Sequence, residues 1–121
     1  MALIERLARP LFWAALIFAY SAAIMPQAEA PHIAASDKIE HMIAFFTLAL
    51  LAGLGWPRRA LWRTGLGLAG VGAAIEITQA IPMLHRDANA MDFLADCAAI
   101  LFGLAIIAAI RLLPAYRAPA D

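Results

Sequence analysis

Histidine and carboxylate side chains recur at helical spacing in a chain that is otherwise strongly apolar. Asp37 and His41 are four residues apart, as are Asp92 and Asp96, and Glu76 interrupts another apolar stretch. Residues three or four positions apart share one face of a helix, so each pair can point into the same space. Imidazole and carboxylate groups gathered in this way can act as base and acid, or they can ligate a divalent metal ion.

The composition indicates which elements must position these side chains. Of the 121 residues, 64% are hydrophobic and 15% are charged, and the mean hydropathy is +0.79. A soluble domain is nearer half apolar and a quarter charged, and a soluble core of this size would not bury so much apolar surface. Nine basic residues balance nine acidic ones, so nothing indicates a nucleic-acid partner, and the single cysteine, Cys97, excludes an internal disulfide framework. We therefore predict an integral membrane protein whose first partner is the lipid bilayer.

The chain is predicted to be one all-α domain over residues 1–121, a compact bundle of four transmembrane helices. Crossing about 30 Å of hydrocarbon takes about 20 helical residues. Prolines stand just past three of the apolar stretches, where a helix most easily ends. We expect the first stretch to be an uncleaved anchor and not a signal peptide, because Pro31 directly after Ala30 makes a poor cleavage site. The predicted helices lie near residues 8–25, 37–56, 61–82 and 90–113.

The basic residues predict how this bundle is oriented. Cytoplasmic loops of membrane proteins carry an excess of Lys and Arg. The two termini and the 57–63 loop hold seven basic residues, whereas the other loops hold only Lys38 and Arg86. We therefore expect a multi-pass protein with both termini in the cytoplasm.

Polar residues of three helices are predicted to converge on the opposite, outer side. At about 1.5 Å per residue, His41, Glu76 and Asp96 lie about 6 to 9 Å inside the helix ends on that side. Ionisable groups are costly in lipid and normally face protein or a wet cavity. We therefore predict an outward-facing, mainly acidic pocket in the outer leaflet. Its candidate residues are Asp37, Lys38, His41, Glu76, Gln79, Arg86, Asp92 and Asp96.

Structural roles are the alternative for these residues. Asp37 with Glu40, and Asn89 with Asp92, have the spacing of capping boxes at helix N-termini. The two deeper acids lie away from any predicted helix start, but they can pair with basic residues of the outer loops and hold the bundle together. Both interpretations stay open.

The polar residues also follow a characteristic order along the chain. The order is Asp37-Lys38-x-x-His41, then Glu76-x-x-Gln79, then Arg86 and Asp92 before a final apolar helix with Gly103. Over about residues 36–103 it resembles the VanZ-like family of small bacterial membrane proteins. That family usually has Asn where this chain has Asp96, and Gly where it has Ala99. The extra acid makes the predicted pocket more negative.

The resemblance implies a protein of the bacterial cytoplasmic (inner) membrane that serves the cell envelope. The founding member of the family is associated with low-level resistance to the glycopeptide antibiotic teicoplanin. For this chain the resemblance implies binding of, or action on, an envelope component: a lipid headgroup, a cell-wall precursor or a cationic amphiphile. It also implies a link to glycopeptide resistance. We expect no cofactor, and a bound divalent metal ion stays open.

Two other functions stay open. One is a membrane-embedded hydrolase or transferase, in which His41 and Glu76 act as base and acid, or in which His41 and the acids hold a divalent metal. The other is a small four-helix transporter, although such transporters depend on an acid in the middle of their first helix and none lies between Arg9 and Glu29. A bundle of this size can also form a homodimer, although no residue requires it.

Overall fold

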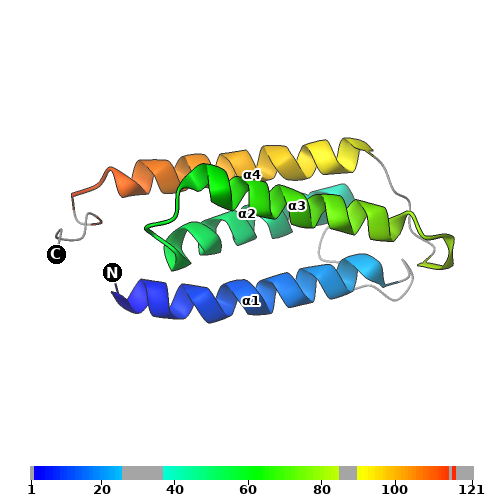
Figure 1. Cartoon of the computed structure of the whole chain (residues 1–121), viewed down its shortest axis with the longest axis horizontal. Coiled ribbons are helices and arrows are strands. Elements are labelled where there is room, and N and C mark those ends of the chain that lie inside the picture. The colour runs from blue at the N-terminus through cyan, green and yellow to red at the C-terminus, as the bar shows by residue number, and fades with distance from the viewer. Residues whose placement is uncertain (1, 26–36, 85–89, 115, 117–121) are drawn as a thin grey trace.

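Every element that the structure describes is helical. The computed structural model describes residues 2–25, 37–84, 90–114 and 116. They form four α-helices, which confirms the predicted all-α class, and one short 3₁₀ turn. The helices are α1 (Ala2–Ile24), α2 (Asp37–Gly55), α3 (Leu61–Gln79) and α4 (Ala90–Arg111), with the turn η1 (Pro82–Leu84) after α3 (Figure 1).

The helix bounds differ most from the prediction at the start of α1. The helix begins at Ala2, not near residue 8, and continues through Pro10. Its first turns carry an ion pair between Glu5 and Arg9 at 2.6 Å, so the polar residues that interrupt the apolar stretch also stabilise the helix. At the other end of the bundle, α3 ends at Gln79 and not near residue 82. The remaining bounds agree with the prediction within two residues.

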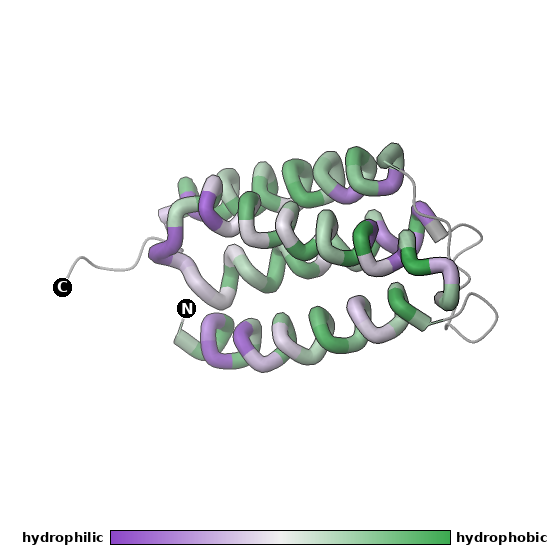
Figure 2. The backbone as a smooth tube through the Cα atoms, turned by 45° about the vertical axis from the view of Figure 1, so that its right-hand side comes forward, coloured by the Kyte–Doolittle hydropathy of each residue, from purple (hydrophilic) through white to green (hydrophobic). Residues whose placement is uncertain are grey.

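The four helices alternate in direction, so the bundle has two distinct ends. Figure 1 shows the start of α1, the α2–α3 turn and the end of α4 together at one end, here called the terminal end. The opposite end, here called the connection end, holds the ends of α1 and α3 and the starts of α2 and α4. In Figure 2 green, hydrophobic stretches run along all four helices, and purple segments gather near the ends.

Three helices are long and apolar enough to cross a membrane by length and composition. They are Ala2–Ile24, Lys38–Gly55 and Ala90–Arg111. Large apolar side chains such as Ile17, Phe102 and Leu101 are mostly exposed on their outer surfaces, as expected of a surface that faces lipid rather than water. α3 is less apolar than its neighbours because it carries Arg63, Glu76, Gln79 and four glycines within 19 residues.

α2 is the central helix and packs against the other three. Its buried side chains follow one stripe at helical spacing: Phe45, Leu48, Ala49 and Ala52. Against this stripe, Gly103 of α4 approaches so closely that a Cβ added there would lie 2.7 Å from the Cβ of Ala49. Only glycine fits at that crossing, and the small residues let α2 and α4 approach each other closely.

Arginine side chains close the terminal end of the bundle. The last carbonyls of a helix have no partner within the helix. Arg9 of α1 donates from Nε to the carbonyl oxygen of Gly55 at 2.7 Å, and Arg111 of α4 donates to the carbonyl oxygen of Arg59 at 3.0 Å. The guanidinium groups of Arg9 and Arg59 also lie over the Trp56 ring, at 5.6 and 5.4 Å from its centre. These contacts fix α1 and α4 to the end of α2.

Candidate functional site

The buried stripes of α2 and α4 each begin with a polar residue near the connection end. On α4 the stripe runs Asp96, Ala99, Ile100, Gly103 and Leu104. On α2 it starts with His41, one turn before Phe45. Because each residue continues the spacing of the core positions, the packing that buries the apolar side chains also carries these two inward.

His41 and Asp96 meet across the contact between α2 and α4. Nδ1 of the imidazole lies 3.9 Å from Oδ2 of the carboxylate. The Asp96 residue is fully buried, and His41 is only 8% exposed. This burial matters because a carboxylate inside an apolar core costs free energy unless positive charge or hydrogen-bond donors compensate it.

Glu76 of α3 brings a third ligand-type group to the same place. One ligand atom of each of the three residues His41, Glu76 and Asp96 lies within 4.8 Å of the other two. Glu76 is partly buried, so it is the least enclosed of the three residues. We call these three residues the polar triad. An imidazole and two carboxylates at this separation can hold a metal ion, or they can exchange protons as base and acid.

The inner side of the polar triad is closed by apolar groups. Gly72 lies one turn before Glu76 on α3, and a Cβ added there would lie 3.6 Å from Oδ2 of Asp96 and 3.5 Å from Cζ of Phe45. Phe45 and Ile75 are both almost fully buried. Gly72 thus lies directly beside the Asp96 carboxylate, and the inner side of the triad borders the apolar core at Phe45.

Lys38 and Asp92 form a second contact between α2 and α4, nearer to the start of both helices. Lys38 Nζ lies 3.8 Å from Asp92 Oδ1. Lys38 precedes His41 by three residues and Asp92 precedes Asp96 by four, so this ion pair lies about one turn farther toward the connection end than the triad. The lysine side chain is 45% exposed and that of Asp92 only 14%, so the pair lies at the rim of the site.

Gln79 is bound to α1 through its amide. Its Nε2 donates to the carbonyl oxygen of Ala23 at 2.8 Å, and the residue is almost fully buried. One position earlier, the Thr78 hydroxyl lies 3.1 Å from that of Tyr20 of α1 and donates to the carbonyl oxygen of Ala74. These bonds fix the end of α3 to the end of α1, and thereby set the position from which Glu76 projects.

Two of the predicted site residues have no described side chain. Asp37 is the first residue of α2, but its side chain lies outside the described residues, and Arg86 lies outside them altogether. The structure therefore brings together His41, Glu76 and Asp96, joins Lys38 to Asp92, and directs the Gln79 amide to α1.

Sequence reasoning passed over two residues that shape the site. Neither Gly72 nor Phe45 was predicted to belong to the site. Both could have been found from spacing, because Gly72 is four residues before Glu76 and Phe45 four residues after His41.

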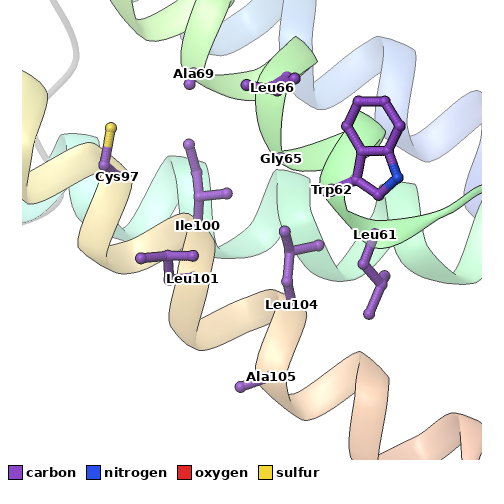
Figure 3. A pocket seen from close by; sticks show the side chains of 10 residues that line it. All are labelled: Leu61, Trp62, Gly65, Leu66, Ala69, Cys97, Ile100, Leu101, Leu104 and Ala105. Carbon is purple, nitrogen blue, oxygen red and sulfur yellow. The ribbon is translucent and has the colours of Figure 1, made fainter.

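A separate apolar cavity of about 600 Å³ lies between α3 and α4, toward the terminal end. Figure 3 shows that the side chain of Cys97 belongs to this cavity, although Cys97 directly follows Asp96 in the chain. Neighbouring helix positions point about 100° apart, so the thiol is not part of the polar triad. The cavity is lined by Leu61, Trp62, Gly65, Leu66, Ala69, Cys97, Ile100, Leu101, Leu104 and Ala105.

Comparison with known proteins found no matching family model, no matching curated protein and no matching solved structure.

Proposed function

We propose that the chain crosses the cytoplasmic membrane of a bacterium four times, with both termini in the cytoplasm. α2 ends at the terminal end and α4 begins at the connection end, so α3 must run the length of the bundle between them. Its 19 residues span about 28 Å, close to the hydrocarbon thickness. The seven-to-two division of basic residues favours the terminal end as the cytoplasmic one. The polar triad then lies on the outer side.

The function we propose is the binding of, or action on, a component of the cell envelope by the polar triad and its rim. The component would present its polar part to the site: a lipid headgroup, a cell-wall precursor or a cationic amphiphile. One observation carries this proposal. Three consecutive helices each direct an ionisable side chain to one place, and two of these side chains are buried. Such an arrangement is costly in a membrane protein and is typical of functional sites.

The resemblance to the VanZ-like family supports the same proposal. The residues that carry the resemblance lie in each part of the site. They are His41 and Glu76 in the triad, Lys38 and Asp92 in the rim ion pair, and Gln79 in the bond between α3 and α1. Under this proposal a change in sensitivity to glycopeptides or to cationic amphiphiles is the expected phenotype of a deletion strain.

The test compares two isosteric substitutions in that deletion strain. Glu76→Gln removes a charge from the triad, and the control Glu5→Gln removes one from the exposed start of α1. We expect both variants to reach wild-type abundance in the membrane, and only Glu5→Gln to restore the envelope phenotype. A Glu76→Gln protein that is abundant and restores the phenotype in full would overturn the proposal.

A membrane-embedded hydrolase or transferase is the second candidate. It is favoured by the 3.9 Å separation of His41 Nδ1 and Asp96 Oδ2, because a carboxylate next to an imidazole orients it and stabilises its protonated form. His41 would then act as the base toward a substrate that enters beside Glu76. Release of a product from labelled envelope lipids by the purified protein, abolished by His41→Gln, would favour this candidate over binding alone.

A further inference from the structure

The polar triad combines three metal-ligand groups that the fold itself brings together. His41 comes from α2, Glu76 from α3 and Asp96 from α4, and one ligand atom of each lies within 4.8 Å of the others. The helices are held in place by contacts elsewhere, such as the approach of Gly103 to Ala49 between α2 and α4. The three groups are therefore positioned before any ligand arrives.

We infer that His41, Glu76 and Asp96 form a binding site for one divalent transition-metal ion of the Zn²⁺ class. The inference deepens the proposed function, because it rests on the triad being the functional site and names an ion that would act there. Each residue would supply one donor atom to the ion: His41 an imidazole nitrogen, and Glu76 and Asp96 one carboxylate oxygen each.

Charge favours a divalent ion at this place. Two ionised carboxylates and a neutral imidazole carry two negative charges, and a divalent cation brings the whole centre to zero. This balance matters here because Asp96 is fully buried, with Phe45 and Gly72 on its inner side. Buried carboxylates in proteins are commonly paired or bound to metal ions.

The donor types and their number indicate which ion fits. Ca²⁺ takes six to eight oxygen ligands, and Mg²⁺ prefers oxygen and keeps several waters. Zn²⁺ accepts imidazole and carboxylate together, at bonds of about 2.0–2.2 Å. Tetrahedral ligands at that bond length lie about 3.4 Å apart. The His41 and Asp96 atoms at 3.9 Å need to approach by about half an ångström, and pairs with Glu76, which lie within 4.8 Å, by up to about 1.4 Å.

Three protein ligands also leave a coordination position open. Structural zinc sites have four protein ligands, whereas catalytic sites keep one position for water or substrate. Glu76 is the least buried member of the triad, so the open position is assigned to the Glu76 side of the site. A phosphate or carbonyl oxygen of an envelope component is the kind of ligand that this position would take.

Protons are the competing occupant of the same three groups. An imidazolium at His41 and one proton shared between the two acids would also neutralise the site. Metal-binding measurements distinguish the two occupants. A proton network binds no stoichiometric metal, whereas a metal site binds its ion much more weakly when any one donor is replaced.

The experiment uses the full chain in mild detergent, purified without a histidine tag, stripped with chelator and then titrated with Zn²⁺ and with Co²⁺. We expect one ion per chain by elemental analysis, and visible Co²⁺ absorption bands of a low-symmetry site. His41→Gln, Glu76→Gln and Asp96→Asn should each weaken Zn²⁺ binding at least 100-fold, while Glu5→Gln binds as the wild type. Glu76→Gln is the decisive variant if Asp96→Asn fails to fold, because Glu76 is only partly buried.

Two results would overturn the inference: wild-type protein that retains no stoichiometric Zn²⁺, or Glu76→Gln protein that binds Zn²⁺ as tightly as the wild type. Failure of the metal site and failure of the proposed function are distinguishable. Protein without metal whose envelope phenotype still depends on Glu76 overturns the metal site alone. A metal-free Glu76→Gln variant that restores the phenotype in full overturns the functional role of the triad and leaves the metal site intact.

Discussion

The His41 imidazole and the Asp96 carboxylate face each other across the α2–α4 contact, with Nδ1 3.9 Å from Oδ2. Each residue begins the buried stripe of its helix near the connection end, where the next core positions are apolar. The pair therefore couples the chemistry of the site to the packing of the bundle. Whatever positive charge compensates Asp96, a proton on His41 or a bound metal ion, also stabilises the contact between α2 and α4.

The first prediction follows from this coupling. If the triad holds Zn²⁺, adding the ion to stripped protein should raise the stability of the folded state. The gain is about 2.7 kcal/mol when free Zn²⁺ is 100 times the dissociation constant. Thermal unfolding in detergent, with and without Zn²⁺, measures this as a rise in the midpoint. Glu76→Gln should unfold at the same temperature in both conditions. An equal rise in both proteins would assign the effect to binding elsewhere.

The second prediction uses three glycines with different surroundings. A Cβ at Gly103 would lie 2.7 Å from the Ala49 Cβ, whereas one at Gly72 meets only ordinary contacts and one at Gly67 meets nothing within 4 Å. Gly103→Ala should therefore cost about 1–3 kcal/mol of stability through overpacking. Gly72→Ala and Gly67→Ala should be neutral or stabilise the helix by up to about 1 kcal/mol. Unfolding titrations of the three variants measure these differences.

A Gly103→Ala variant as stable as the wild type would show that α2 and α4 can separate without loss. Gly72 offers a further comparison, because a larger side chain there would reach the triad. Gly72→Leu should weaken Zn²⁺ binding by displacing the Asp96 carboxylate, while Gly67→Leu, in open space on the same helix, should not.

The sequence was sufficient to predict four helices, although Glu76 lies only three residues from the end of α3 and not six as predicted. Helical spacing, proline positions and the charge-free stretches carry that information, and three of the four helix ends on the C-terminal side agree within two residues. The start of α1 could not be predicted in the same way. The charged residues Glu5 and Arg9 suggest that the apolar helix begins after them. In the structure they instead form an ion pair along the helix surface.

The partner of Gln79 shows a second limit of sequence reasoning. Its spacing from Glu76 indicates one helix face, and that face is wide enough to contact two different helices. The acceptor is the main-chain carbonyl of Ala23, and every residue has such a carbonyl, so no residue type marks it in the sequence. Which helix each side chain meets depends on the rotation of α3, which is set by packing along its whole length.

The third prediction separates Gln79 from the triad. Gln79→Ala removes the bond to the Ala23 carbonyl and leaves a small buried void, so we expect a loss of about 2–3 kcal/mol in stability. Zn²⁺ affinity of the folded fraction should change less than threefold, because no Gln79 atom belongs to the group of metal ligands. Thermal unfolding and zinc titration of the same preparation give both values. A large loss of affinity with unchanged stability would move Gln79 into the binding site.

The last prediction concerns orientation, on which the outward position of the triad depends. The basic side chains of the terminal end are tied into the fold: Arg9 binds the Gly55 carbonyl and Arg111 binds that of Arg59. Reversing the bundle would move all of them across the membrane, and basic residues favour the cytoplasmic side. When fused after Asp121, a reporter that works only in the cytoplasm should therefore be active. The matched fusion truncates the chain after Ile81, in the turn beyond α3, and there a reporter that works only outside the cytoplasm should be active. If both fusions report the same side, α4 does not cross the membrane. If the two fusions report the opposite pattern, the triad lies toward the cytoplasm, and the proposal of an envelope ligand that arrives from outside is overturned.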